Sequence, residues 1–475
     1  MALSIPDVNL ASLLPEIILL AAATATLFLS GRDGHRRAAS WAAAAVAASL
    51  LTTPVLFRGA DVAGFDGLIV KDGGTLFFLA LMDLAALVAL FLSRDGDVGR
   101  GGEFCGLALF ALIGMHVMAA GRDLLVVFLG LEILALPLYI LVGSDRMARD
   151  GMEGAVKYFL LGSFSSALFL LGLAFYYGAT GTTALGAAPM ALSSPALLFA
   201  GLALVTVGVG FKIAAVPFHM WAPDTYEGAP VPVAAYISVA PKIAAFAVLV
   251  RIGLDATGPG SDSITQAVLV MSVASMIVGN LAALRQAGFV RMLAYSGIAQ
   301  AGTMLIGLLA LPGEGRAALS FYLLVYIFMN LGAFAAAVAL CRREGGRLQI
   351  EDLSGLAARR PLLAFALTVF MVSLAGLPPT GGFFAKFYLF KAGIEAGYLT
   401  VILVAIVMTV VSLYYYLRIV AFMYMRDDTG CLEIRTGLPL LAGLIGTVAI
   451  LTLLSGILPG ELLRGILAIF PPAAL

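Results

Sequence analysis

The chain has 475 residues, of which 61% are hydrophobic and 12% are charged. Soluble domains are about 45–50% apolar, so this composition excludes an ordinary soluble protein and indicates a protein that crosses a membrane many times. The 28 basic and 28 acidic residues give a net charge of zero. The charge balance therefore gives no reason to expect a nucleic-acid partner.

Apolar stretches of about 20 residues, the length of helix that crosses a bilayer, recur along the whole chain. We count about 14 of them and predict an all-α polytopic membrane protein. Glycine, proline and charged residues separate the stretches. Their approximate centres, in chain order, are Leu20, Ala47, Asp83, Ala111, Leu131, Phe169, Val207, Ala244, Met276, Gly302, Ile327, Val372, Met408 and Ile450.

Two of the expected spans are interrupted in a similar way. The seventh runs through Lys212 and then meets Pro217 and His219. The twelfth meets Pro379, between glycines, shortly before Lys386. Proline and paired glycines break the ladder of helical hydrogen bonds, and open backbone at membrane depth is tolerated only where protein or water covers it. We therefore predict that helices 7 and 12 are broken and line polar cavities.

The two breaks are five spans apart, and an odd number of spans inverts the second copy of a repeat relative to the first. This spacing predicts two inverted five-helix repeats, formed by spans four to eight and nine to thirteen. We divide the chain into three N-terminal helices (1–100), a first repeat (101–258), a second, inverted repeat (259–425) and a C-terminal helix with its tail (426–475).

The distribution of basic residues between loops predicts the orientation, because arginine and lysine are retained on the inner side. Alternate loops, beginning with 31–37, carry most of the loop arginines, including those in 94–100, 285–291 and 342–347. We expect these loops on the inner side. With an even number of spans, both termini then lie outside.

Only six lysines occur in the chain, against 22 arginines. A lysine at the centre of a bilayer helix costs roughly 2.5–3.5 kcal/mol on insertion scales, which points to a function for any that lie there. Unlike arginine, a buried lysine amine can lose its proton, so lysine suits a site that must titrate. Four lysines lie within or beside long apolar stretches: Lys157, Lys212, Lys242 and Lys386.

Glu132 has apolar neighbours on both sides in the fifth span. A membrane-buried lysine would lower its insertion cost, and the two titrations would be coupled. The alternative is a fixed ion pair that only holds two helices together. Lys157, at the start of the sixth span, is near enough to the inner surface to extend its amine there. Lys242 follows Pro241, which frees a backbone carbonyl for an amine or a water.

Cofactor ligands are not evident. The three cysteines stand far apart without a C-x-x-C pattern, so no iron–sulfur or zinc ligand set is visible: Cys105, Cys341 and Cys431. A haem between His116 and His219 is conceivable, but their sequence contexts share nothing. Asp83 has no evident cationic partner, which favours a protonated or helix-capping acid.

The run 211–230, FKIAAVPFHMWAPDTYEGAP, resembles a signature of the antiporter-like subunits of respiratory complex I. This family includes subunits L, M and N of bacterial NADH:quinone oxidoreductase and large subunits of multisubunit sodium/proton antiporters. The chain is most similar to the subunit N branch, because Lys386 stands where subunit M would carry a glutamate. The resemblance covers essentially the whole chain, with matching spans for Glu132, Lys157, Lys242 and Lys386.

The resemblance also implies roles for these residues in proton translocation. Glu132 would pair with Lys212. Lys242 would relay protons at the centre, and Lys386 would lie on the outward exit side. Lys157 would belong to the same series of titratable groups.

One position departs from the family pattern. Many relatives carry a histidine where Gln300 stands, and a glutamine can order water but cannot take up a proton. This departure favours water-mediated transfer between the central and exit lysines. The supporting residues that we expect, besides Gln300, are His219, Pro217, Pro241 and Pro379.

The resemblance implies a proton-translocating subunit of a respiratory NADH:quinone oxidoreductase in the bacterial inner membrane. Redox chemistry in other subunits would drive it, with no cofactor in this chain and with FMN, iron–sulfur clusters and quinone in partner subunits. Antiporter-like subunit M, small membrane subunits and lipid would be its partners. The alternatives are a subunit of a multisubunit sodium/proton antiporter and a structural membrane anchor whose lysines only hold helices together.

Overall fold

The computed structural model describes residues 9–29, 32–56, 61–95, 102–145, 148–186, 194–255, 261–311, 313–342, 346–430, 432–434 and 439–470. The helices of the first half are η1 (Leu10–Leu13), α1 (Leu14–Leu27), α2 (Arg32–Leu56), α3 (Gly73–Asp95), α4 (Glu103–Ala120), α5 (Leu124–Val142), α6 (Arg149–Thr180), α7 (Pro195–Lys212), α8 (Trp221–Gly228) and α9 (Val231–Asp255). Those of the second half are α10 (Ser261–Leu284), α11 (Phe289–Leu309), α12 (Gly315–Ala339), η2 (Glu351–Leu353), α13 (Leu356–Arg359), α14 (Pro361–Ala375), α15 (Gly381–Glu395), α16 (Leu399–Met425), α17 (Pro439–Ile457) and α18 (Pro459–Ile469).

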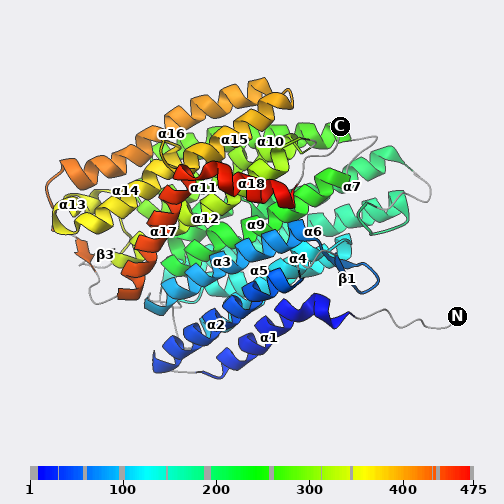
Figure 1. The fold of residues 1–475 in the computed structure, drawn as a ribbon, viewed down its shortest axis with the longest axis horizontal. Helices are drawn as coiled ribbons and strands as arrows, with labels where there is room; N and C mark the ends of the chain where they lie inside the picture. The colour runs from blue at the N-terminus through cyan, green and yellow to red at the C-terminus, as the bar shows by residue number, and fades with distance from the viewer. Residues whose placement is uncertain are drawn as a thin grey trace.

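Thirteen helices of the described residues are long and apolar enough to cross a membrane. A fourteenth crossing consists of two shorter helices, α14 and α15. The prediction of an all-α polytopic protein with about 14 spans is confirmed, as expected for a chain whose backbone must satisfy its own hydrogen bonds in lipid. Figure 1 shows α1 and α2 at one edge of the bundle, α16 at the opposite edge, and α9 and α12 between them.

Both predicted helix breaks are present. The segment 213–220, with Pro217, separates α7 from α8, and the segment 376–380, with Pro379, separates α14 from α15. Gly376 ends α14 with a φ of 83°. Glycine adopts this left-handed conformation at little cost, which explains why the helix ends there.

The two five-helix units, α4 to α9 and α10 to α16, are built alike. Their first two helices approach backbone to backbone at glycines. A Cβ on Gly114 of α4 would lie 2.3 Å from the backbone nitrogen of Leu134, and a Cβ on Gly279 of α10 would lie 2.5 Å from that of Ala299. In each unit the broken helix packs along the third helix, α7 and α8 on α6, and α14 and α15 on α12.

The division of the chain into four segments remains our proposal. Two of its boundaries, at 100/101 and 258/259, lie outside the described residues.

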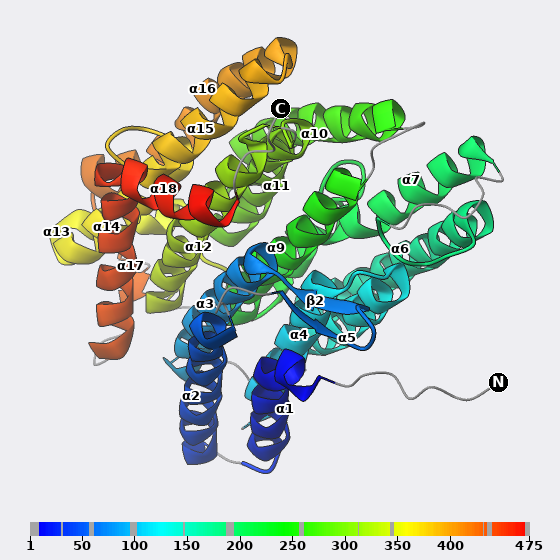
Figure 2. The same cartoon turned by 45° about the vertical axis from the view of Figure 1, so that its right-hand side comes forward.

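Four short strands were not predicted from the sequence. β1 (Val62–Gly64) and β2 (Ile69–Lys71) form an antiparallel hairpin between α2 and α3. At the opposite end of the bundle, β3 (Leu340–Arg342) after α12 pairs with β4 (Leu432–Ile434) between α16 and α17. The last helix, α18, runs across the bundle rather than along it (Figure 2).

Burial distinguishes central from peripheral helices. In the apolar window of α9 every residue is buried, and in that of α12 94% are, against 28% for α2. Peripheral helices present large apolar side chains outward, as contact with lipid requires. A polar side chain on α9 or α12 is therefore surrounded by protein, so its partners must come from neighbouring helices.

Candidate functional site

Glu132 and Lys212 lie on neighbouring helices of the first unit. The carboxylate of Glu132 on α5 accepts a hydrogen bond from the Ser166 hydroxyl on α6. Lys212, the last residue of α7, is buried, and its Nζ has no hydrogen-bond partner among the described residues. Its Nζ lies 5.2 Å from the centre of the Tyr139 ring and 5.3 Å from that of Tyr158. The amine is thus held by aromatic faces rather than by an acceptor.

The direct pair that the resemblance implied is not formed. Glu132 and Lys212 interact electrostatically, but no nitrogen and oxygen of the two lie within 4.0 Å. The Ser166 hydroxyl donates a hydrogen bond to the Glu132 carboxylate, and aromatic rings surround the Lys212 amine. The charges are therefore coupled through space rather than joined by a contact.

The first break is held by side chains from other segments. The Val216 backbone N–H donates to the Ser275 hydroxyl at 2.8 Å, and Nε1 of Trp221 donates to the Phe211 carbonyl at 3.0 Å. Pro217 is exposed, and His219 is half-buried with its Nδ1 unbonded. Among the described residues, no hydrogen bond or ion pair joins either residue to a buried lysine, so a supporting role for them is our proposal.

Lys242 lies at the centre of the protein on α9. It is buried, directly follows Pro241, and its Nζ donates to the Gly297 carbonyl of α11 at 2.7 Å. The Nζ also lies 5.6 Å from the centre of the Tyr326 ring on α12. Lys242 therefore bridges the two units, since α9 closes the first and α11 belongs to the second.

Lys386 caps the broken helix of the second unit. Its Nζ donates to the carbonyls of Leu374 at 3.2 Å and Ala375 at 3.0 Å, at the end of α14. These carbonyls have no partner further along the helix because α14 stops at Ala375. An ammonium there also interacts favourably with the negative end of the helix dipole. Pro379, within the break, is exposed.

Gln300 joins the surroundings of the central and exit lysines. It lies on α11 near Gly297, the acceptor of Lys242, and its Nε2 donates to the Leu374 carbonyl at 3.0 Å, the acceptor that Lys386 also uses. The amide also bonds two phenols, donating to Tyr416 at 3.1 Å and accepting from Tyr322. Lys386 and Gln300 thus share one backbone acceptor, whereas Lys242 bonds a carbonyl of the helix that carries Gln300.

A small polar cavity of about 10 Å³ adjoins Gln300 and Lys386. Its other walls include Asn280 and Ser412. This volume is close to the minimum that holds one water, and the polar walls could bond it. The cavity supports the expectation of water-mediated transfer past Gln300.

We expect Gln300→Leu to destabilise the protein by about 1–3 kcal/mol, because the substitution leaves the Leu374 carbonyl with one donor and the Tyr322 hydroxyl without its acceptor. Thermal unfolding of the detergent-purified protein measures the effect. Thr303→Val, one turn along α11, is the control, since the Thr303 hydroxyl bonds only its own helix. Equal, small shifts for both variants would show that the amide network contributes little.

Lys157 differs from the other three lysines. Its side chain is 41% exposed, and its Nζ lies 2.6 Å from Glu153 and 2.7 Å from Asp224. The amine extends to the surface, as the alternative interpretation of this residue anticipated. The structure therefore places Lys157 in a surface ion-pair network rather than among the buried amines.

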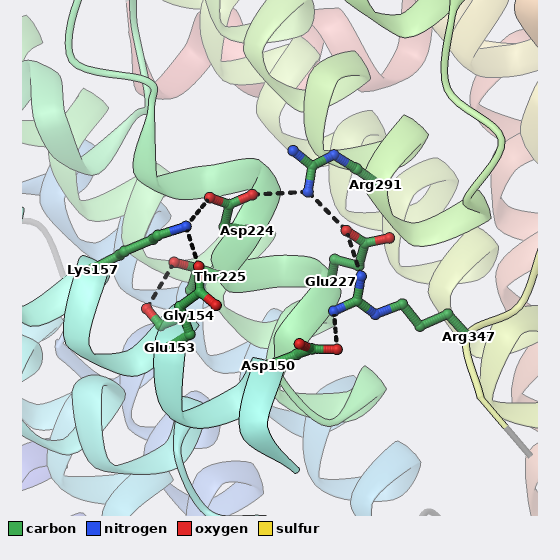
Figure 3. Close-up of polar contacts among 9 residues, drawn as sticks. All are labelled: Asp150, Glu153, Gly154, Lys157, Asp224, Thr225, Glu227, Arg291 and Arg347. Atoms are coloured by element: carbon green, nitrogen blue, oxygen red, sulfur yellow. Dashed lines mark hydrogen bonds and ion pairs between the residues drawn. The ribbon is translucent and has the colours of Figure 1, made fainter.

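That network connects the two units (Figure 3). Asp224 on α8 also contacts Arg291 of α11 at 2.8 Å, and Arg291 contacts Glu227 of α8 at 2.7 Å. Arg347 lies 3.1 Å from Glu227 and 2.5 Å from Asp150 of α6. The half-helix that follows the first break is thereby attached to both units through charges.

Asp72 immediately precedes α3, at the end of the bundle opposite to this network, and arginine side chains lie close to its carboxylate. Arg122 and Arg251 lie 3.2 Å and 3.8 Å from its carboxylate. Burial would raise the pKa of Asp72, but hydrogen bonds from Thr75 and the charges of the two arginines hold it below the usual value. A cavity of about 320 Å³ opens here and is lined by Asp72, Arg122, Arg251 and Arg316.

Sequence reasoning missed one buried polar cluster. Asp83 accepts a hydrogen bond from Ser49 at 2.9 Å and lies 3.2 Å from Nε2 of His116. The other ring nitrogen of His116 lies 3.5 Å from Glu16, which Lys71 contacts at 2.7 Å. His116 is thus a partner of Asp83 that the sequence did not reveal, and it is a cation when its ring is protonated. Both His116 nitrogens face carboxylates, so a haem between His116 and His219 does not fit. The signal that the sequence offered for this cluster was an acid and a histidine, Asp83 and His116, placed within two successive apolar stretches.

Comparisons with known proteins identify the family. The family described as NADH:quinone oxidoreductase/Mrp antiporter, TM, matches residues 121–412. The chain is 40% identical over 460 residues to NADH-quinone oxidoreductase subunit N 2 of Rhizobium meliloti (strain 1021), covering 95% of each. The chain belongs to the NADH-quinone oxidoreductase subunit N family. It is also 43% identical over 448 residues to the subunit N of Desulfovibrio desulfuricans, covering 88% of each.

Solved structures agree with membership in the subunit N family. A chain of respiratory complex I from Thermus thermophilus with bound aureothin has a TM-score of 0.83 and 36% identity, covering 96% of this chain and 99% of that one. A chain of the Mrp complex from Dietzia sp. DQ12-45-1b has a TM-score of 0.82 but only 23% identity, which shows a shared fold alone. The resemblance to subunit N, and a multi-pass membrane protein of a multisubunit complex, are confirmed.

Proposed function

We propose that this chain is a proton-translocating membrane subunit of a respiratory NADH:quinone oxidoreductase. The observation that carries the proposal is the placement of three buried lysines, Lys212, Lys242 and Lys386, at the helix breaks and the central helix of a subunit N fold. A buried amine exists in charged and neutral forms, so each lysine is a place where a proton can be held and released.

The proposed path runs from Glu132 and Lys212 through Lys242 to Lys386. A proton that arrives at one amine disfavours a second charge on its neighbours by Coulomb repulsion, which is strong where the dielectric constant is low. Lys212 has no hydrogen-bond partner to hold its charge, whereas Lys242 and Lys386 donate to backbone carbonyls. In this proposal, a water in the cavity beside Gln300 delivers the proton to Lys386.

Redox energy would come from other subunits. Among the described residues, no group of three or more histidine, cysteine or acidic side chains is placed to hold a metal ion. We assign FMN, the iron–sulfur clusters and the quinone site to partner subunits. Antiporter-like subunit M and small membrane subunits are the neighbours that we propose within the complex.

We place the protein in the bacterial inner membrane with both termini on the periplasmic side. In a variant without native cysteines, Arg464→Cys on α18 should react with a membrane-impermeant maleimide added to spheroplasts. Asp427→Cys, after α16, should react only once the membrane is opened, because basic loops are retained inside. Both positions are exposed, so accessibility within the protein does not differ. The reverse labelling pattern would contradict the orientation.

Association with NADH oxidation is the direct test of the proposed function. The tagged chain, extracted in mild detergent, should migrate on a native gel in the band that oxidises NADH. A sodium/proton antiporter subunit is the second candidate, because the matching family also includes Mrp antiporters. Migration with other membrane proteins but without NADH oxidation, together with antiport activity in membranes that lack NADH dehydrogenase, would favour that candidate.

A further inference from the structure

A second cluster of titratable side chains lies where the N-terminal helices α1 and α3 meet α4, the first helix of the first five-helix unit. It consists of Glu16 on α1, Lys71 on β2, Asp83 on α3 and His116 on α4. All four are at least nine-tenths buried: Glu16 is 7% exposed and the other three 1% or less. The burial of four ionisable groups in one place costs desolvation free energy, so packing alone does not explain the cluster.

The surroundings of His116 favour a protonated ring. Its Nδ1 lies 3.5 Å from a Glu16 oxygen and its Nε2 lies 3.2 Å from an Asp83 oxygen. A neutral imidazole carries one N–H and can serve only one of the two acceptors, whereas an imidazolium serves both. Neither contact meets the geometry of a hydrogen bond, so attraction between opposite charges is what would join a protonated ring to the two carboxylates.

Charge balance agrees with this assignment. With both acids ionised, Lys71 compensates one negative charge through contacts of 2.7 Å and 2.8 Å to Glu16. One negative charge remains, and a proton on His116 neutralises it. The loss of that proton leaves the buried cluster with a net charge of −1, which favours its return.

The groups around the cluster are otherwise neutral. Ser49 of α2 donates to Asp83, and the Tyr236 hydroxyl of α9 donates to the Ala108 carbonyl of α4 at 3.0 Å. The helix α5 presents Gly130 and Leu134 to α4. No other charge therefore competes for the proton among the contacts that the described residues make here.

The cluster has neighbours on both sides. Lys71 is followed by Asp72, which lines the cavity of about 320 Å³ at the hairpin end of the bundle. Toward the centre of the bundle, Tyr236 is close enough to Asp83 to interact with its charge. Tyr236 lies on α9, the helix that also carries Lys242. The cluster thus lies between an open cavity and the central helix.

We propose that Glu16, Lys71, Asp83 and His116 form a second proton-binding site, in which His116 exchanges a proton with the cavity at the hairpin end. One proton leaves the imidazolium, a neutral imidazole remains, and the site recovers one proton from the same side. The proposal goes beyond the lysine path and does not require it.

Nitrogen-15 magnetic resonance of the full chain in lipid vesicles tests the exchange. The chain contains three histidines, so the spectrum of His116 is the difference between histidine-labelled wild type and His116→Gln. If that variant fails to fold, His35→Gln and His219→Gln assign the other two signals instead. We expect the His116 ring to change reversibly from two protonated nitrogens to one as pH rises. A ring that keeps one state at every pH would overturn the proposal.

A second measurement asks whether the exchanged proton belongs to translocation. In the intact complex in sealed vesicles, His116→Gln and the matched control His35→Gln should both leave the number of protons moved per NADH unchanged, because the exchanged proton returns from the side to which it left. The His35 ring contacts the Ser93 carbonyl, away from the cluster. A lowered ratio in assembled His116→Gln complex would contradict exchange with one side only and would place this proton in net transport. That outcome would leave the lysine path intact, because Lys212→Met tests it separately.

Discussion

Replacement of Lys212 by methionine should lower NADH-driven proton transport by about tenfold or more while the complex still assembles. Methionine keeps the length of the side chain but has no proton to give. Because Nζ of Lys212 has no hydrogen-bond partner among the described residues, its removal leaves no unsatisfied acceptor. A small change in stability with a large loss of transport is the signature that we expect.

The measurement is proton uptake and NADH oxidation in the same sealed vesicles. Lys391→Met is the matched control, since Lys391 is a partly exposed lysine that pairs with Glu314 at 2.8 Å. Its removal should leave transport within experimental error of the wild type. If Lys212→Met pumped the wild-type number of protons per NADH, the proposed role of this amine would be refuted.

Lys386 calls for a pair of substitutions, because its amine both caps a helix and is a candidate proton carrier. Lys386→Met removes the donor to the Leu374 and Ala375 carbonyls. We expect it to cost about 1–3 kcal/mol, because the Ala375 carbonyl is left unsatisfied while Gln300 still donates to that of Leu374, and to reduce transport as well. Lys386→Arg keeps a permanent cation at the end of α14 but cannot release a proton.

The arginine variant should therefore assemble close to normally and yet transport protons poorly. Thermal unfolding and proton transport of both variants separate the two roles. Normal transport by Lys386→Arg would show that Lys386 acts only as a cap. The close approach of Gly376, where an added Cβ would lie 2.8 Å from Cδ of Lys386, shows how tightly the capping geometry is packed.

The sequence predicted the elements that depend on local chemistry. Prolines and glycines located both helix breaks, although a proline alone does not decide a break, since Pro241 lies within the continuous helix α9. The lysines stood out through the cost of charge in an apolar run. Lys386 bonds backbone carbonyls at a helix break, whereas Lys242 bonds the Gly297 carbonyl of α11, a continuous helix without proline.

Partnerships across long separations could not be predicted in the same way. Asp224 is 67 residues from both Lys157 and Arg291, and no local pattern links them. The pairing of Glu132 with Lys212 was inferred from resemblance, but aromatic rings occupy the space around the amine. Such contacts depend on the rotation of each helix about its axis, which hydrophobic length does not specify.

The pairing of β3 with β4 constrains the order in which the chain can be completed during synthesis. The Leu340 backbone lies opposite Ile434, and Arg359 donates to the Leu432 carbonyl at 3.0 Å. The ribosome makes β3 first, but its partner emerges only after α14, α15 and α16 have been translated and threaded through the bilayer. The second unit therefore stays open on this side until late in its biogenesis, and chains that stop before residue 432 lack the strand that closes it.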